Sequence, residues 1–161
     1  MTETELERYI DLYRTSVYTA ALCRCGNPSD ADDAVQDVFL KLYTCGKEFN
    51  DDEHVKAWLL RCTINRCADI KRSHWNKFSV PLDEAGEKVH YDSKDLGQSA
   101  LIEAIGKLDG VNRTVFYLYY SEGYSVSEIA EIMKMSGTAV RSRIARTRNR
   151  LKKLLEDEGS L

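Results

Sequence analysis

The sequence lacks the marks of a membrane or secreted protein. None of its 161 residues belongs to an apolar run long enough to span a bilayer. The first ten residues, MTETELERYI, are acidic and periodic, which is unlike a signal peptide. With 43% apolar and 30% charged residues, the composition is ordinary for a soluble globular protein. We therefore expect a cytoplasmic protein that does not insert into a membrane.

The cysteines also lack a recognisable pattern. No two of them form C-x-x-C, and their number, five, is odd, so a complete disulfide framework is not expected. Their spacings, alone or with a histidine, fit no zinc module, and a cytosolic cysteine is usually a small buried hydrophobe. We expect no metal and no cofactor, and redox sensing by the cysteines stays open. The residues concerned are Cys23, Cys25, Cys45, Cys62, Cys67, His54 and His74.

β-Strand patterns and internal repeats are missing too, and helical spacing dominates. Helices are expected at residues 3–25, 28–43, 52–77, 100–108 and 111–121, with two more within 125–155. Residues 78–97 lose this periodicity and contain Pro81, Gly86 and Gly97 among many charges. We expect an all-α fold of two small helical domains, residues 1–77 and 99–161, joined by a flexible linker at 78–98.

Residues 125–155 predict a helix-turn-helix. Ser125 and Glu128 form an S-x-x-E capping box, which starts a first short helix. Ser136 is a suitable N-cap for a second helix, whose apolar residues recur at helical spacing. Two short helices joined by a small-residue turn, with the second exposed and basic, fit the geometry that enters a DNA major groove.

The charge of this segment supports nucleic-acid binding. Residues 134–153 contain eight bases and no acid, although the chain as a whole has a net charge of −3. Residues 1–100 hold 13 bases and 18 acids, net −5, and residues 101–161 hold 10 and 8, net +2. A basic amphipathic helix can also be merely solvated or bound to an acidic partner. The capping box, turn and first helix in front of it favour DNA.

Two further helices carry candidate binding faces. Asp30, Asp32, Asp33 and Asp37 crowd the first turns of helix 28–43, where acids suit the helix dipole. A metal or nuclease site would need carboxylates that converge on one point, whereas Asp33 and Asp37 share a face and Asp30 and Asp32 diverge from it. The cluster is therefore either a solvated face stabilised by the helix dipole or, as the functional interpretation, a docking surface for a basic partner. Helix 52–77 has Trp58 in its expected core stripe, with Val55, Leu59, Cys62 and Ile70, and a polar side with Asn65, Asp69 and several bases.

The order of these features resembles the extracytoplasmic-function (ECF) sigma factors, small promoter-specificity subunits of bacterial RNA polymerase. DADDAVQDVFLKLY at 30–43 resembles their region 2.2, and AWLLRCTINRCADIKR at 57–72 resembles regions 2.3 and 2.4. The segment 113–155, with its V-R-S-R-I-x-R-x-R core, resembles region 4. We expect no counterpart of regions 1.1 and 3 of primary sigma factors and no extra C-terminal domain. The resemblance implies a non-enzymatic subunit that directs promoter-specific transcription initiation.

The resemblance also implies roles for particular residues. The helix at 30–43 would use Asp33, Gln36, Asp37 and Lys41 to bind the coiled coil of the β′ subunit in core polymerase. The β subunit would be a further partner. Single-stranded minus-10 DNA, with one extruded base, would be read by Phe49, Asn50, Asp51, Asn65, Asp69 and Arg72. The minus-35 major groove would face Arg141, Ser142, Ala145 and Arg146, while Thr138, Arg143 and Arg148 would hold phosphates.

The sequence departs from the family pattern at two places, and other functions also compete with the resemblance. The family often begins region 4 with Leu-Pro-x-x-x-Arg, whereas here Asp109 follows Leu108 and no proline precedes Arg113. Ala145 replaces a commonly larger side chain, so its base contact would be limited to a thymine methyl or absent. An anti-sigma partner is expected by analogy with the family. The main alternative is a stand-alone helix-turn-helix regulator, and a metal nuclease has only the aspartates in its favour.

Overall fold

The computed structural model describes residues 1–78 and 99–157, with side chains at all of these positions except 75–78 and 99. Within these ranges every regular element is an α-helix. The chain divides into two compact units, Met1–Leu82 and Asp83–Leu161. The described residues thus form an all-α protein, as predicted. Residues 79–98, which make up nearly all of the expected linker, lie outside the described part.

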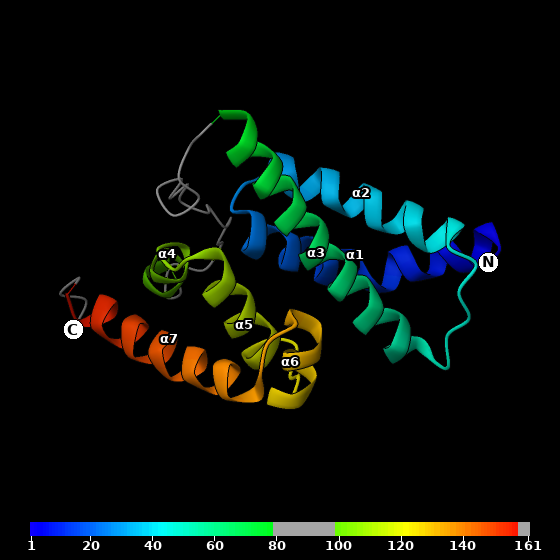
Figure 1. Ribbon diagram of the computed structural model, residues 1–161. Helices are drawn as coiled ribbons and strands as arrows, with labels where there is room; N and C mark the ends of the chain where they lie inside the picture. The colour runs from blue at the N-terminus through cyan, green and yellow to red at the C-terminus, as the bar shows by residue number, and fades with distance from the viewer. Residues whose placement is uncertain (79–98, 158–161) are drawn as a thin grey trace. The chain divides into compact units, whose positions relative to one another are not determined.

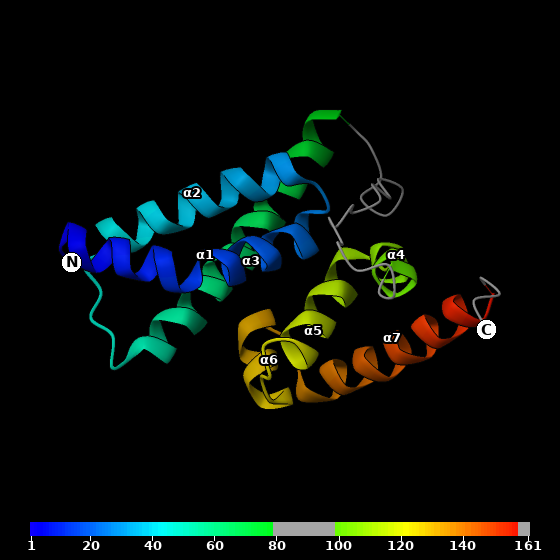
Figure 2. The same cartoon turned by 180° about the vertical axis from the view of Figure 1, so that it is seen from behind.

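The first unit consists of α1 (Glu3–Cys25), α2 (Pro28–Thr44) and α3 (Asp52–Phe78), each packed against the other two (Figure 1). Local signals set these boundaries. α1 ends at Gly26, whose φ of 87° suits glycine, and Asn27 and Pro28 start α2 as N-cap and first helical residue. Figure 2 shows the same three helices from behind.

Small and branched apolar side chains fill the core of this unit. α1 supplies Val17, Ala20 and Ala21; α2 supplies Ala31, Ala34, Val38 and Leu42; α3 supplies Val55, Leu59, Leu60 and Cys67. The alanines of α1 and α2 let the two helix backbones approach closely. Trp58 and Cys62 depart from expectation, because both are only half-buried while Leu60 and Ile64 are buried. Packing on two sides, against α1 and α2, widens the buried stripe of α3 and rotates it away from Trp58.

The second unit contains α4 (Ser99–Gly106), α5 (Gly110–Tyr120), α6 (Val126–Met133) and α7 (Gly137–Asp157). α7 packs on the other three helices, and α5 also contacts α6 (Figure 1). Ala104, Leu108 and Leu151 form a core cluster between α4 and α7. α4 stops two residues before the predicted end, because residues 107 and 108 form a tighter turn.

The missing proline at the start of α5 has a structural substitute. Asp109 is the N-cap, and its carboxylate accepts hydrogen bonds from the backbone N–H and the side-chain amide of Asn112 at 2.9 and 2.8 Å. The buried guanidinium of Arg113 donates to the carbonyls of Gly106 and Leu108 at 3.3 and 2.6 Å. These bonds satisfy carbonyls at the end of α4 and fix the turn between the two helices.

Candidate nucleic-acid interface

Two caps and a left-handed turn build the helix-turn-helix. The Ser125 hydroxyl accepts from the Glu128 N–H at 3.1 Å, and the Glu128 carboxylate accepts from the Ser125 N–H at 3.3 Å. α6 ends at Lys134, whose φ of 55° lies in the left-handed region. The Ser136 hydroxyl then accepts from the Ala139 N–H at 3.0 Å and starts α7. Both caps predicted from the sequence are confirmed.

α7 has one face that packs against the rest of the unit and an opposite face that is exposed. Its inward stripe is Val140, Ile144, Thr147 and Leu151. The opposite face carries Thr138, Arg141, Ser142, Ala145 and Arg146, all exposed. Two hydrogen bonds order this face from within the helix: Arg141 Nη2 donates to Thr138 Oγ1 at 3.3 Å, and Arg146 Nε donates to the Ser142 carbonyl at 3.4 Å. Five of the seven residues expected at minus-35 DNA therefore share one outward face.

The other two lie at the flank of that face, against α5. Arg143 is half-buried, and its Nη1 donates to Asn112 Oδ1 at 3.0 Å. Arg148 Nε donates to the Tyr120 hydroxyl at 2.9 Å, and its guanidinium lies 5.7 Å from the centre of the Tyr120 ring. Since a guanidinium has five N–H donors, each arginine keeps donors for a phosphate. These contacts fix where the remaining donors point, which the sequence could not reveal.

The connection from α2 to α3 carries Phe49, Asn50 and Asp51 and is ordered by the first turn of α3. Asp51 caps that helix: its Oδ1 accepts from the His54 N–H at 2.8 Å. The His54 Nδ1 accepts from the Asn50 N–H at 3.2 Å. Phe49 makes edge contacts with His54 and Trp58, with ring centres 5.2 and 5.6 Å apart. The three residues expected to take an extruded base thus belong to one structured loop.

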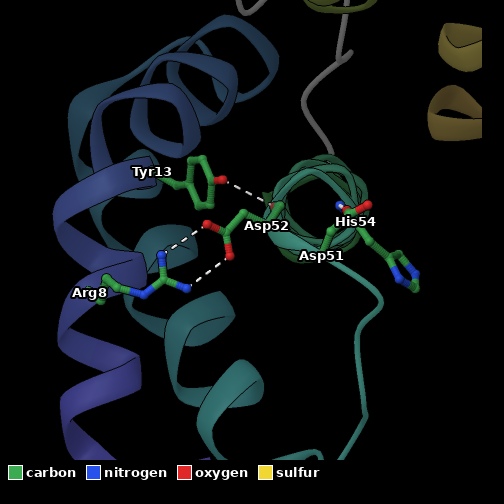
Figure 3. A network of polar contacts seen from close by, with 5 residues as sticks. All are labelled: Arg8, Tyr13, Asp51, Asp52 and His54. Carbon is green, nitrogen blue, oxygen red and sulfur yellow. Dashed lines mark hydrogen bonds and ion pairs between the residues drawn. The ribbon is translucent and has the colours of Figure 1, made fainter.

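The start of α3 is also held by α1, a contact that the sequence analysis missed. Figure 3 shows Arg8 and Tyr13 of α1 directed at Asp52. Arg8 donates two hydrogen bonds to the Asp52 carboxylate, both at 2.9 Å, and the Tyr13 hydroxyl donates to the Asp52 carbonyl at 3.1 Å. The Arg8 hydrogen bonds lower the pKa of Asp52. Burial, and then the Asp52 charge, raises the pKa of Tyr13.

The polar face of α3 brings together the remaining predicted minus-10 residues. Asn65, Asp69 and Arg72 follow one another at helical spacing, with Asn65 half-buried and the other two exposed. Arg72 and Asp69 form an ion pair on this face. Carboxylate and guanidinium therefore order each other beside Asn65, which would leave the amide to read base edges.

The outer face of α2 contains the predicted docking residues Asp33, Gln36, Asp37 and Lys41, all exposed. Asp37 accepts from Arg66 Nε of α3 at 2.7 Å, a bond that raises the pKa of Arg66. Lys41 lies toward α3, 5.8 Å from the centre of the Trp58 ring.

Two apolar residues of this face were missed. Leu40 keeps 62% of its surface exposed and Tyr43 keeps 38%. The signal was present in the sequence, since Leu40 lies four residues after Gln36 on the polar side of the predicted helix. Leu40 and Tyr43 lie three residues apart on the helix, so they form a small exposed apolar pair beside the charged residues.

Throughout residues 1–78 and 99–157, no three His, Cys, Asp or Glu side chains gather as a metal ion would require. A hydrogen bond to Cys25, together with burial, raises the pKa of Cys67. Burial raises the pKa of Cys62. These thiols therefore resist conversion to the reactive thiolate.

No helix in the described ranges is both long enough and apolar enough to cross a bilayer.

Each of the two units matches a known protein family. Residues 9–77 match the family described as Sigma-70 region 2, and residues 98–151 match Sigma-70, region 4. The ECF RNA polymerase sigma factor SigM of Mycobacterium tuberculosis is 30% identical over 126 residues, which are 78% of this chain and 64% of SigM. The alignment thus spans slightly less than two thirds of that relative. The RNA polymerase sigma factor CnrH of Cupriavidus metallidurans is 30% identical over 143 residues, 80% of this chain and 74% of CnrH.

Solved structures share the fold. The sigma factor RpoE of Bartonella quintana, in complex with the anti-sigma factor NepR, aligns with a TM-score of 0.74 and 21% identity, over 94% of this chain and 97% of RpoE. CnrH in complex with the cytosolic domain of CnrY aligns with a TM-score of 0.64 and 24% identity, over 97% of this chain and 90% of that chain.

Proposed function

The chain belongs to the sigma-70 family, in its ECF group, and from this premise we propose that it binds RNA polymerase core and directs promoter-specific transcription initiation. The observation that carries the proposal is the pairing of two modules in one chain. A three-helix unit that matches region 2 precedes a helix-turn-helix that matches region 4 and presents a basic outward face. In this role the chain is a specificity subunit and not an enzyme.

The second unit would read the minus-35 element. The outward face of α7 offers arginines that are exposed but held at defined positions by bonds within the helix. Arg141 and Arg146 are suited to guanine O6 and N7, and Ser142 and Ala145 lie between them. Arg143 and Arg148, braced by Asn112 and Tyr120, would hold phosphates on the flank of the groove.

The first unit would open and read the minus-10 element. The loop at Phe49, Asn50 and Asp51 would take an extruded base, and the polar face of α3 would follow the same strand. Phe49 offers an aromatic surface for stacking, and the loop's backbone and side-chain groups offer hydrogen bonds to base edges. Because single strand is bound and duplex is not, the binding energy itself would drive opening of the duplex.

The outer face of α2 would bind the polymerase, through the coiled coil of its β′ subunit, with the β subunit as a further contact. Leu40 and Tyr43 would supply apolar area toward the C-terminal end of this face, and Asp33, Gln36 and Asp37 would supply polar contacts toward its N-terminal end. Apolar area next to polar groups is usual in a protein–protein interface. An anti-sigma partner that covers these surfaces is part of the proposal, supported by the complex of RpoE with NepR.

Transcription in vitro tests the proposal. The purified chain is added to bacterial core polymerase and a library of random DNA of promoter length, and the 5′ ends of the transcripts are sequenced; core polymerase alone is the control. We expect start sites that share two separated upstream motifs. If no transcripts appear and the protein alone binds a palindromic duplex tightly, it is instead a stand-alone regulator.

A further inference from the structure

The N-terminal helix reaches the loop that would take the minus-10 base. We propose that Arg8 and Tyr13 of α1 are positioning residues for base capture by the loop at Phe49, Asn50 and Asp51. Neither touches DNA in this role. They fix Asp52, the first residue of α3, and through it the loop that precedes it. The inference rests on the proposed function, because that function supplies the base.

The contacts form a short stack on one face of α1. The Tyr9 and Tyr13 rings lie with their centres 6.3 Å apart and their planes 12° apart. The Arg8 guanidinium lies 4.7 Å from the centre of the Tyr9 ring and makes both of its 2.9 Å bonds to Asp52. Tyr13 donates to the carbonyl of the same residue. Side chain and backbone of Asp52 are therefore held at once, from one helix.

This arrangement fixes the loop at its downstream end. Asp51, next to Asp52, is the N-cap of α3 and also part of the loop. From the other side of the helix start, His54 binds the Asn50 N–H and packs on Phe49. Figure 3 shows His54 pointing away from α1, so the two anchors lie on different sides of the α3 terminus. A loop held in this way loses little freedom on binding, which raises affinity for its ligand.

Stability is a poor explanation for this network. The side chains of Arg8 and Asp52 are 50% and 46% exposed. Exposed ion pairs typically add little to stability, and bidentate geometry such as that of Arg8 and Asp52 places a pair at the upper end of that small range. A bidentate guanidinium–carboxylate pair does, however, set the distance and orientation of its two partners. The network is therefore better suited to holding the start of α3 in place than to holding the unit together.

We call the contacts of Arg8 and Tyr13 with Asp52 the clamp. The test measures whether the clamp affects affinity for DNA only when the captured base is present. Holoenzyme is assembled from core polymerase and the full chain, and its affinity is measured for fork-junction DNA carrying the minus-10 motif found by transcription. A series of probes each lacks one base of that motif. The probe on which wild type loses most affinity identifies the captured base. The variants are Arg8→Gln and Tyr13→Phe, with Arg14→Gln, an exposed arginine of the same helix, as the matched control.

We expect Arg8→Gln to weaken binding of the intact probe roughly 5- to 20-fold, the scale on which ordering a loop changes affinity. Tyr13→Phe should lose less affinity for this probe, and Arg14→Gln should lose none. On the probe without the captured base, all of these variants should equal wild type, because nothing remains to be positioned. The double variant Arg8→Asp with Asp52→Arg should recover part of the loss.

Three outcomes would overturn the inference. Equal losses on both probes would mean that Arg8 supports the unit or polymerase binding in general. Wild-type affinity of Arg8→Gln for the intact probe would mean that the loop needs no clamp. If wild-type holoenzyme itself does not distinguish the probes, the minus-10 role of the loop is wrong and the inference fails with it. Transcription from the library separates this last case from a failure of the whole proposed function.

Discussion

At the scale of single residues, the buried guanidinium of Arg113 does the work of a helix cap. It donates to the carbonyl of Gly106, the last residue of α4, and to that of Leu108 in the turn that follows. Such carbonyls have no partner within their own helix, and leaving them buried and unbonded is costly. Without Arg113, the turn between α4 and α5 would lose its main internal support.

We therefore expect Arg113→Met to lower the free energy of unfolding of the second unit by about 2–3 kcal/mol. Methionine fills similar space but donates no hydrogen bond. Urea unfolding of the full chain, followed by the amide NMR signals of residues 100–120, measures the change. The matched control is Arg150→Met, which removes an exposed arginine of α7 and should shift stability by no more than about 0.5 kcal/mol. Equal effects would contradict the capping role.

Asp52 links the clamp to pH. Its hydrogen bonds from Arg8 lower its pKa below the ordinary aspartate value of about 3.9. The stabilisation by this pair is fully present above the unfolded-state pKa and is lost as pH falls through the lower, folded-state pKa. We expect NMR titration of the carboxyl carbon to show this low pKa, and Arg8→Gln to raise it. Arg14→Gln should leave it unchanged; an unshifted pKa in the wild type would contradict the pair.

At the scale of elements, the turn of the helix-turn-helix carries a strained residue. Lys134 adopts a φ of 55°, which costs an L-residue energy that glycine does not pay. We expect Lys134→Gly to stabilise the second unit by about 0.5–1 kcal/mol, since added freedom of the unfolded chain offsets part of the gain. Thermal unfolding of the full chain measures it.

Gly123 is the matched control for that prediction. It has a φ of 74° and open space where a Cβ would lie, so any effect of Gly123→Ala is conformational and not steric crowding. This variant should destabilise the unit by about 1 kcal/mol. A loss of stability in Lys134→Gly instead would show that the lysine side chain makes contacts worth more than the strain.

The outward face of α7, which we propose reads the minus-35 element, yields a prediction about specificity. If Arg146 is bidentate to guanine, Arg146→Ala should cost about 1–3 kcal/mol of promoter discrimination at one position. If it contacts only phosphate, binding should weaken equally on all sequences and the salt dependence should flatten. Holoenzyme affinities for promoter variants at several salt concentrations separate the two cases. Arg150→Ala, farther along α7, is the control for general loss of positive charge.

The sequence predicted most of the elements because their start and stop signals are local. Asn27-Pro28 and the Ser125–Glu128 capping box act within one helical turn and needed no knowledge of the fold. The half-buried position of Trp58 was not predictable in this way, because it depends on how α1 and α2 pack against α3. The pair of Arg8 and Asp52 joins residues 44 positions apart, which helical periodicity cannot connect. The exposure of Leu40, by contrast, could have been predicted from a helical wheel of residues 28–43.

At the scale of the whole molecule, charge argues against tight DNA binding by the chain alone. Residues 1–100 carry a net charge of −5 and residues 101–161 only +2. The chain as a whole therefore attracts DNA phosphates only weakly. We expect the free chain to bind a promoter duplex only weakly at physiological salt, and the holoenzyme to bind it tightly. Fluorescence anisotropy with and without core polymerase checks this, and a scrambled duplex is the control. Tight, specific binding by a dimer of the free chain would favour the regulator instead.

The division of α7 into an inward stripe and an outward face has an evolutionary consequence. Val140, Ile144, Thr147 and Leu151 carry the packing, while the outward residues bond only within the helix or lie free on its surface. Substitutions on the outward face therefore cost the fold little. If this face reads the minus-35 element as proposed, a duplicated copy of this gene can acquire new promoters and its own set of target genes while the protein stays folded.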